Sequence, residues 1–334
     1  MTPLLISIVV IGRNEGVRLA RCLDSVAAMY RNGFETETIY VDSGSTDGSP
    51  ALAKAAGAQV IVLHSIRPTA AQGRNAGWRA ASGSIVLFLD GDTLLDPHFV
   101  ADSLEAFDDA SVAVVWGHRR ETFATRSLYN RVLDLDWIYP PGYTEFCGGD
   151  ALFRRVALET TGGFDETLIA GEEPELCCRI TGSGLCILHV DRAMTGHDLG
   201  ITRFSQYWRR ATRAGHAFAE VSARFVHTDS PFWLAESRRN SLRAIVLFDI
   251  PLLGIAFSAA TRSLWPFLFA VAILLALALR TSWKARWKTN DRVALALYGV
   301  HSHLQQIPIF IGQVRFWMNQ RSGRRAGLVE YKQP

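Results

Sequence analysis

The sequence predicts an α/β protein with a mostly parallel sheet, followed by an apolar helical region. Over residues 1–230, short β-branched and aromatic runs alternate with segments of helical periodicity, which is the pattern of a parallel sheet covered on both faces. Residues 242–280 are instead almost uncharged, in a chain that is 49% hydrophobic and 20% charged overall. From 334 residues we expect two domains, over residues 1–230 and 231–334.

The expected elements of the first domain follow one another as strand and helix. We expect strands over residues 4–11, 37–41, 59–63, 85–89, 112–117 and 187–190. Helices are expected from after residue 15 to about residue 30, and over residues 49–56, 73–81, 97–106, 151–161, 174–181 and 205–225. Turns rich in glycine bound several of these segments.

Two apolar runs, over about residues 244–260 and 264–280, dominate the second domain. Each is near or below the ~17–25 residues that a spanning helix needs, and basic residues flank the pair on both sides. By the positive-inside rule both ends lie in the cytosol, so a membrane hairpin is expected; a buried helical subdomain or an in-plane pair remains open. Residues 293–318 mix apolar and polar side chains and favour an interfacial helix.

Composition argues for some partners and against others. The net charge of +3 is small, and no stripe of basic and aromatic residues supports nucleic-acid binding. Much of the basic excess flanks the apolar runs, which favours a membrane surface. The five cysteines are odd in number and lack metal-ligand spacing, so we expect reduced thiols and a catalytic domain in the cytoplasm. The first residues do not have the pattern of a signal peptide.

The chemistry is expected at Asp90-Gly91-Asp92, directly after the apolar run of residues 84–89. Ligands of α/β proteins bind at the carboxyl ends of the strands. Carboxylate oxygens suit Mg²⁺ or Mn²⁺, which proteins often hold through one or two carboxylates together with phosphates of the substrate. Such a motif alone could also be a loop with two solvated acids, so the interpretation depends on the motifs around it.

Four further motifs occur in a fixed order around this D-x-D motif. They are residues 9–15 (VVIGRNE) and 41–48 (VDSGSTDG), each ending a strand, residues 73–77 (GRNAG), opening a helix, and residues 171–176 (GEEPEL). In this order, over about residues 5–215, the chain closely resembles family 2 glycosyltransferases. The resemblance implies the GT-A fold, a Rossmann-like nucleotide-sugar-binding domain, and a donor that is UDP-linked or related.

The resemblance assigns a nucleotide-sugar site to residues of these motifs. Asn14 and Glu15 match residues that contact the nucleoside, although Glu15 could equally be an acid at a helix start. Asp42 can accept a hydrogen bond from a nucleobase N–H, or it can form an Asx turn. The residues expected near the diphosphate and its metal are Arg74, Asp90, Asp92 and the late histidine His197. Arg74 could instead form a surface salt bridge, and Asp90 could also lie near the ribose.

A hydroxyl acceptor also needs a base on the side opposite the leaving group. The family supplies it from a Glu-Asp pair at a helix start, and the matching pair here is Glu172-Glu173. By register we expect Glu173 to be the base; Glu172 or Glu175 could serve instead, and any of the three could simply cap the helix. In-line displacement by one nucleophile predicts inversion, so that an α-linked donor gives a β-linked product.

Two further segments are candidate sugar-binding sites. Gly149 permits close approach of a sugar to the backbone, and Asp150 could bind a donor or acceptor hydroxyl, with a structural turn as the alternative. Gln206, Arg209 and Arg210 resemble the Q-x-x-R-W signature of processive β-glycan synthases, with Arg210 in place of the tryptophan. That resemblance implies binding of the acceptor sugar and the diphosphate; a basic amphipathic helix on lipid is the alternative.

We therefore predict a metal-dependent, inverting glycosyltransferase of the hexosyltransferase type, attached to the inner or plasma membrane. It would transfer a sugar from a nucleotide-diphosphate donor to a hydroxyl of a glycan or lipid-linked acceptor, in cell-envelope or exopolysaccharide synthesis. One alternative is a polyprenyl-phosphate glycosyltransferase, whose phosphate acceptor needs no base. Others are a processive β-glycan synthase, for which two short spans offer little channel wall, and a nucleotidyltransferase-like or non-catalytic sugar-binding protein.

Overall fold

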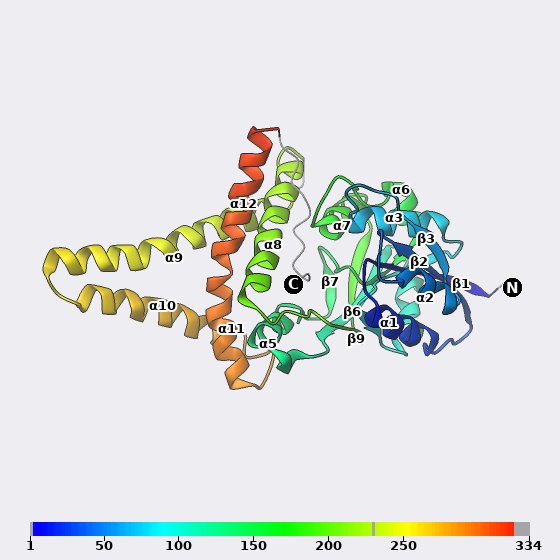
Figure 1. Ribbon diagram of the computed structural model, residues 1–334, viewed down its shortest axis with the longest axis horizontal. Coiled ribbons are helices and arrows are strands. Elements are labelled where there is room, and N and C mark those ends of the chain that lie inside the picture. The colour runs from blue at the N-terminus through cyan, green and yellow to red at the C-terminus, as the bar shows by residue number, and fades with distance from the viewer. Residues whose placement is uncertain (1–2, 229–230, 324–334) are drawn as a thin grey trace. The chain divides into compact units, whose positions relative to one another are not determined.

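The computed structural model describes residues 3–228 and 231–323 (Figure 1). By its contacts the chain divides into two compact units. Unit 1 consists of Met1–Thr122 and Trp137–Asp198, and unit 2 of Phe123–Asp136 and Leu199–Pro334. The expected division at residue 230 was based on composition. The assignment of the catalytic domain to residues 1–230 remains a prediction. In packing, the segment before residue 228 already belongs with the C-terminal helices from Leu199 onward.

Unit 1 is built on a nine-stranded mixed sheet of order β3-β2-β1-β4-β8-β6-β9-β5, with β7 also paired to β9. In its first half, β1 (Leu4–Gly12) is parallel to β2 (Phe34–Asp42) and to β4 (Ile85–Asp90), and β3 (Gln59–Val62) is parallel to β2. This half has the expected parallel arrangement. It brings the carboxyl ends of β1, β2 and β4 to one edge, where the motifs of residues 9–15, 41–48 and 90–92 lie.

The second half of the sheet differs from the expectation. β8 (Ala151–Arg154) runs antiparallel to both β4 and β6 (Val112–Glu121), whereas β6 and β9 (Cys186–His197) are parallel. Residues 151–154 were expected to be helical, but α6 (Arg155–Thr161) begins only after them. β5 (Thr93–Leu95) and β7 (Gly142–Thr144) are too short to show an alternating pattern.

The helices of unit 1 pack closely on the buried strands. The clearest case is α3 (Ala70–Ala80), where a Cβ on Gly77 would lie 2.1 Å from Val9 Cγ1 on β1, so only glycine allows this approach. A capping box between Thr69 and Gln72 fixes the start of α3. Besides α6, the other helices of unit 1 are α1 (Val17–Ala27), α2 (Ser49–Ala55), α4 (Phe99–Ser103), followed by a 3₁₀ turn, and α7 (Glu172–Gly182).

Unit 2 is helical. α8 (Phe204–Phe225) and α12 (Gln306–Arg321) cross so closely that a Cβ on Gly215 would lie 1.9 Å from the Ile309 carbonyl oxygen. The single interfacial helix expected over residues 293–318 is two helices, α11 (Arg292–Leu304) and α12. Pro308 lacks the N–H that would continue the hydrogen-bond ladder, which accounts for the break. α5 (Leu128–Asp136) also belongs to this unit and was not expected.

α9 (Leu234–Thr261) and α10 (Trp265–Lys284) form a hairpin within unit 2 (Figure 1). They are longer than the apolar runs expected at 244–260 and 264–280, and each is long and apolar enough to cross a membrane, judged by length and composition alone. Close contact between Gly254 and Ala270 joins the two helices. Their outward side chains are largely apolar and exposed, among them Leu252, Leu253, Phe257, Phe269 and Leu279.

Candidate active site

The D-x-D motif turns sharply at the edge of the sheet. Asp90 is the last residue of β4, and its backbone carbonyl accepts a hydrogen bond from Thr93 Oγ1 at 2.7 Å. The Gly91 N–H donates to the carbonyl of Ile11 on β1 at 2.8 Å, and a Cβ on Gly91 would lie 3.1 Å from that oxygen. The turn is therefore tied to two strands, which fixes where the two carboxylates begin.

Asp90, Asp92 and His197 form a group that could hold a metal ion. One ligand atom from each lies within 4.8 Å of the others, and His197 Nε2 is 3.3 Å from Asp92 Oδ1. His197 was expected in a loop after a strand ending at residue 190; it is instead the last residue of β9, paired with Thr93 on β5. The sheet thus brings the late histidine to the D-x-D motif.

The imidazole of His197 is suited to metal binding. Burial, and next the charge of Arg119, lower its pKa to about 3, so the ring is neutral at physiological pH, as a metal ligand must be. Its Nδ1 is buried without a hydrogen-bond partner. The two carboxylates supply oxygen ligands that suit Mn²⁺ and Mg²⁺, and the imidazole nitrogen suits Mn²⁺ better than the harder Mg²⁺, so the residues present fit a predicted Mn²⁺ ion.

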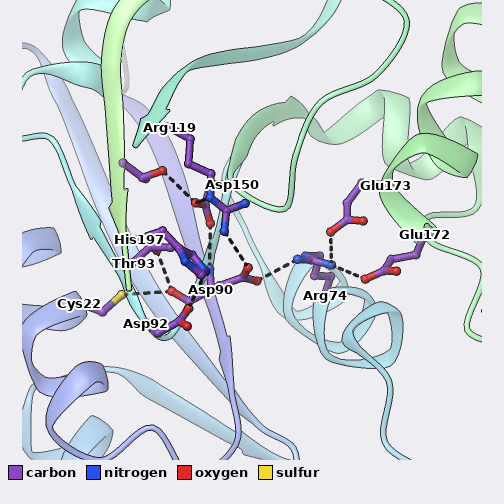
Figure 2. A network of polar contacts seen from close by, with 11 residues as sticks. Cys22, Arg74, Asp90, Asp92, Thr93, Arg119, Asp150, Glu172, Glu173 and His197 are labelled. Carbon is purple, nitrogen blue, oxygen red and sulfur yellow. Dashed lines mark hydrogen bonds and ion pairs between the residues drawn. The ribbon is translucent and has the colours of Figure 1, made fainter. Parts of the chain in front are cut away.

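Arg74 on α3 connects the D-x-D motif to the acidic pair of α7 (Figure 2). Its guanidinium is 2% exposed and contacts three carboxylates. Nη2 lies 2.9 Å from Asp90 Oδ1, and Nη1 lies 2.9 Å from Glu172 Oε1 and 3.0 Å from Glu173 Oε1. One buried cation thus holds acids from two distant parts of the sequence, and Arg74 is not the surface salt bridge that was the alternative.

Glu173 is the titratable group best tuned for proton transfer. Burial, followed by the negative charge of Glu172, raises its pKa to about 7, and Arg74 opposes this rise only in part. The carboxylate of Glu173 remains 18% exposed, compared with 5% for Glu172. A base works best when its pKa lies near the operating pH. Glu175 instead forms a two-point ion pair with Arg179 on the same helix.

Gly149 and Asp150 lie at the centre of this cluster, but in different ways. A Cβ on Gly149 would lie 2.5 Å from Arg74 Nη2 and 3.2 Å from Asp90 Oδ2, so glycine is what allows these groups to converge. Asp150 has no exposed surface. It accepts hydrogen bonds from the Asp90 N–H at 3.0 Å and from Thr195 Oγ1 at 2.9 Å. Asp150 therefore anchors the backbone of the D-x-D motif, and its expected contact with a sugar hydroxyl remains a prediction.

The residues expected at the nucleoside hold two loops together. Asn14, in the left-handed region with φ of 55°, accepts a hydrogen bond from the Thr46 N–H at 2.7 Å through Oδ1. Asp42 accepts the N–H groups of Gly44 and Ser45 through Oδ2, which is the Asx turn given as its alternative, and the Tyr40 hydroxyl through Oδ1. Glu15 pairs with Arg18 at 2.8 Å.

Two residues of the site carried no signal in the sequence. Arg119 Nη2 lies 3.8 Å from Asp90 Oδ2, and its guanidinium stacks on the indole of Trp137 with 4.6 Å between Cζ and the ring centroid. The strand expected to end at residue 117 continues as β6 to Glu121, which is why Arg119 was missed. Trp137 lies in a segment between elements, where no motif marks it.

Gln206, Arg209 and Arg210 lie on α8 in unit 2. Gln206 is buried, and its Oε1 accepts hydrogen bonds from the N–H groups of Thr202 and Arg203, both at 3.0 Å. This side chain therefore caps the start of α8, whereas Arg209 is exposed. The assignment of these three residues to acceptor and diphosphate binding remains a prediction.

The fold and the acids at the edge of the sheet define a glycosyltransferase with the GT-A fold. The family model described as glycosyl transferase family 2 matches residues 7–162. The model described as glycosyl transferase family group 2 matches residues 85–280, more than half of the chain. The chain therefore belongs to glycosyltransferase family 2, and the family expected from the sequence motifs is confirmed.

Solved structures and curated relatives agree with this family. A mannosyltransferase from Pyrobaculum calidifontis, in complex with GDP-Man and Mn²⁺, superposes with a TM-score of 0.64 at 21% identity, covering 96% of this chain and 88% of that one. TarS 1–349 from S. aureus, in complex with UDP-GlcNAc, gives 0.51 at 17%, covering 96% and 93%. At these identities the likeness shows the fold alone.

A curated relative matches in sequence over a shorter range. The pre-mycofactocin glycosyltransferase of Mycobacterium tuberculosis is 28% identical over 198 residues, which are 56% of this chain and 41% of that protein. The chain thus spans about two fifths of the length of this relative. Its activity, donor and acceptor are not transferred by the match.

Proposed function

We propose that this protein is a metal-dependent, inverting glycosyltransferase. It moves a sugar from a nucleoside-diphosphate donor to a hydroxyl of a glycan or lipid-linked acceptor, and UDP is the nucleotide that we propose for the donor. The neighbours solved with GDP-Man and with UDP-GlcNAc support a nucleotide-sugar donor. The nucleoside is proposed to lie at Asn14, Glu15 and Asp42, at the ends of β1 and β2.

One observation carries the proposal: the acids of the D-x-D motif and the acidic pair of α7 belong to one connected group of charges. Asp90 and Glu173 are both within 3.0 Å of the Arg74 guanidinium. A cation site for the diphosphate and a base for the acceptor would thus lie within a few ångströms of each other. A binding protein without catalytic activity has no need for a carboxylate whose pKa is raised to about 7.

The proposed roles follow from this arrangement. Asp90, Asp92 and His197 would hold a divalent ion, which would supply Lewis-acid stabilisation of the departing diphosphate. Glu173 takes the proton of the acceptor hydroxyl. As it does so, the hydroxyl oxygen forms a bond to the anomeric carbon, and the bond from that carbon to the diphosphate breaks. Arg74 keeps Asp90 and the acidic pair at fixed separation, and Gly149 leaves room for their approach.

The direct test is turnover with defined donors. The full-length protein in detergent is given a panel of nucleotide sugars with Mn²⁺ or Mg²⁺ and a membrane extract as acceptor source. We expect release of a nucleoside diphosphate with one donor, loss of this release with a chelator, and a glycosylated product in mass spectrometry. A product formed only on polyprenyl phosphate, and equally fast with Glu173→Gln, would replace hydroxyl transfer by the polyprenyl-phosphate alternative.

We also propose that the α9–α10 hairpin inserts into the membrane, with the catalytic unit in the cytoplasm. α10 has 20 residues, about 30 Å at 1.5 Å per residue, which matches the apolar thickness of a bilayer. Arg238, Arg239 and Arg243 precede the apolar part of α9, and Lys284 and Arg286 follow that of α10. This end of the hairpin is the basic one, as expected for the cytoplasmic side.

A further inference from the structure

The two arginines of the site differ in how much of their hydrogen-bonding capacity is already used. Both terminal nitrogens of Arg74 are in contact with carboxylates at 2.9–3.0 Å, and the side chain is 2% exposed. Reaching an incoming diphosphate would require Arg74 to release Asp90 or the acidic pair. The sequence motif placed Arg74 at the diphosphate, but its contacts place it in the framework of the site.

Arg119 has the opposite character. Its nearest carboxylate oxygens are Asp90 Oδ2, 3.8 Å from Nη2, and Asp150 Oδ2, 3.7 Å from Nε. Both separations exceed hydrogen-bond distance. Nε is buried without a hydrogen-bond partner in Arg119 and in Arg74 alike, so the two arginines differ at their terminal nitrogens. The side chain is 15% exposed. Arg119 is thus attracted by the acids of the site but is not committed to either of them.

Trp137 fixes the direction in which this guanidinium points. The face of its indole supports the Arg119 guanidinium, with Cζ 4.6 Å from the ring centroid. The same ring meets the imidazole of His197 edge to face, with centroids 5.2 Å apart and an angle of 76° between the planes. An arginine stacked on an aromatic face keeps the N–H groups at its edge available for an anion.

Charge gives the reason why an anion should bind there. Arg119 lies near Asp90 and Asp150, Asp90 also pairs with Arg74, and Asp92 lies beside His197. A divalent ion bound at Asp90 and Asp92 would neutralise the acids that now attract Arg119. The Arg119 guanidinium, 15% exposed, would then be available to phosphate oxygens, whereas Arg74, 2% exposed, would keep its Nη1 contacts to Glu172 and Glu173.

We propose that Arg119 binds the diphosphate of the donor directly, and that Trp137 is a positioning residue that holds Arg119 beside the metal ligands. The inference rests on the proposed function, because it takes a nucleoside diphosphate as the leaving group. It predicts that Arg119 contributes to affinity for the diphosphate and not for the nucleoside. A role restricted to neutralising Asp90 and Asp150 predicts no such distinction.

The test measures binding rather than turnover. Full-length parent, Arg119→Gln and Arg120→Gln proteins are titrated with UDP and GDP in the presence of Mn²⁺ by calorimetry, and with uridine and guanosine by ligand-observed NMR. Arg120 is the exposed neighbour of Arg119 on β6 and serves as the matched control. Binding of Mn²⁺ alone is followed by electron paramagnetic resonance, so that a damaged metal site is recognised.

We expect Arg119→Gln to weaken binding of the nucleoside diphosphate that the parent prefers by about 10- to 100-fold, the range for a lost charge-assisted hydrogen bond. Nucleoside and Mn²⁺ affinities should stay within about twofold, as should every affinity of Arg120→Gln. Trp137→Leu should weaken diphosphate binding several-fold, and Trp137→Phe, which keeps an aromatic face, should restore most of it.

The outcomes distinguish an error in the role of Arg119 from an error in the proposed function. If the parent binds UDP or GDP with Mn²⁺ and Arg119→Gln binds it equally well, the role of Arg119 is wrong and the proposed function stands. An equal loss of nucleoside and diphosphate affinity would also overturn it, because the substitution would then have altered the site as a whole. If the parent binds no nucleoside diphosphate, the proposed function itself fails.

Discussion

The two units of this protein bury charged groups in opposite ways. In unit 1, Asp90, Glu172 and Glu173 share one guanidinium, that of Arg74. In unit 2, the groups form a chain: the Tyr207 hydroxyl lies 2.9 Å from His301 Nδ1, and His301 Nε2 lies 3.0 Å from Asp136 Oδ2.

The electrostatic consequences differ accordingly. Burial and the neighbouring Glu172 raise the pKa of Glu173 to about 7. Burial also acts to raise the pKa of Asp136, but the charge and hydrogen bond of His301, together with the charges of Arg210 and Lys288, lower the pKa below its usual value. The unbalanced network leaves a carboxylate poised to exchange a proton, whereas the balanced one holds α5, α8 and α11 together. Imbalance of buried charge, rather than burial itself, therefore distinguishes the candidate active site.

The largest effect is expected from the poised carboxylate. Glu173→Gln removes the base and should reduce the rate of transfer by about 10²–10⁴-fold, while nucleotide affinity is kept. Asp92→Ala should abolish transfer and also weaken Mn²⁺ binding. Initial rates with a saturating donor, and titration with UDP or GDP, check both statements.

The matched control is Glu159→Gln on α6, which alters an exposed i,i+4 ion pair with Arg155 in the same unit. It should retain the rate of the parent. If Glu173→Gln were nearly as fast as the parent, Glu172 would become the candidate base. An equally fast double variant would remove the acidic pair from the mechanism.

A second large effect is expected on membrane association, and only for substitutions in the apolar hairpin of unit 2. Phe257→Glu introduces a charge in the apolar part of α9, where the side chain is 59% exposed. A charge costs about 2.5–3.5 kcal/mol at the centre of a spanning helix and less at Phe257, four residues before the end of α9, so less of the protein should sediment with membranes after carbonate extraction. Val156→Glu, equally exposed at 59% but on α6 in unit 1, should leave the membrane fraction unchanged. Parent protein in the soluble fraction would refute membrane insertion.

A smaller loss is expected at the point where the acids of unit 1 converge. Gly149→Ala places a Cβ 2.5 Å from Arg74 Nη2, so Arg74 must shift and its contacts to Asp90 and Glu173 must lengthen. We expect a loss of stability of about 1–3 kcal/mol and a lower rate of transfer. Gly148→Ala is the control, because its Cβ would come no closer than 3.6 Å to Arg119 Nη1. Equal melting temperatures and equal rates for the two variants would show that the cluster tolerates expansion.

The dependence on pH follows from the raised pKa of Glu173. As a base it must be deprotonated, so the rate should rise through about pH 7 and then level off. For stability the sign is opposite: a carboxyl group whose pKa is raised on folding stabilises the protein while it is protonated, and this contribution is lost as the pH rises through 7. As the pH rises from acid to mildly alkaline, the melting temperature of Glu173→Gln should therefore increase relative to that of the parent. A constant difference would contradict the raised pKa.

Much of the first unit could be predicted from the sequence because its signals are local. β1 is apolar except for Ser7, and β4 is a continuous apolar run up to Asp90. The motifs at residues 9–15, 41–48 and 90–92 lie at strand ends, so the convergence of Asp90, Asp92 and the residues near Asn14 and Asp42 follows from parallel pairing alone. The antiparallel insertion of β8 could not be predicted, because it has only four residues and runs directly into α6 without a turn residue to mark the boundary.

The parts of the site that were missed depend on side-chain packing between distant segments. Arg119 lies on a strand extension, and Trp137 reaches it from 18 residues further along the chain, so no spacing marks the pair. The hydrogen bond from the Asp90 backbone to Asp150 could not be predicted from the sequence either, because an aspartate in a glycine-rich loop is equally compatible with a sugar contact. The sequence indicates which residue types meet, whereas packing decides which of them remain available to a ligand.

The smallest effect is expected in the balanced network of unit 2. Tyr207→Phe removes one buried hydrogen bond to His301 and keeps the ring, so the free energy of unfolding should fall by about 1 kcal/mol. Nucleotide affinity should not change, since the remaining His301–Asp136 pair keeps its geometry. Thermal melting in detergent and titration with UDP measure the two quantities, with the exposed Tyr30→Phe as control. A loss of nucleotide affinity without a loss of stability would contradict the contrast between the two networks, because a chain of fully paired groups would then contribute to binding as directly as the unbalanced cluster around Arg74.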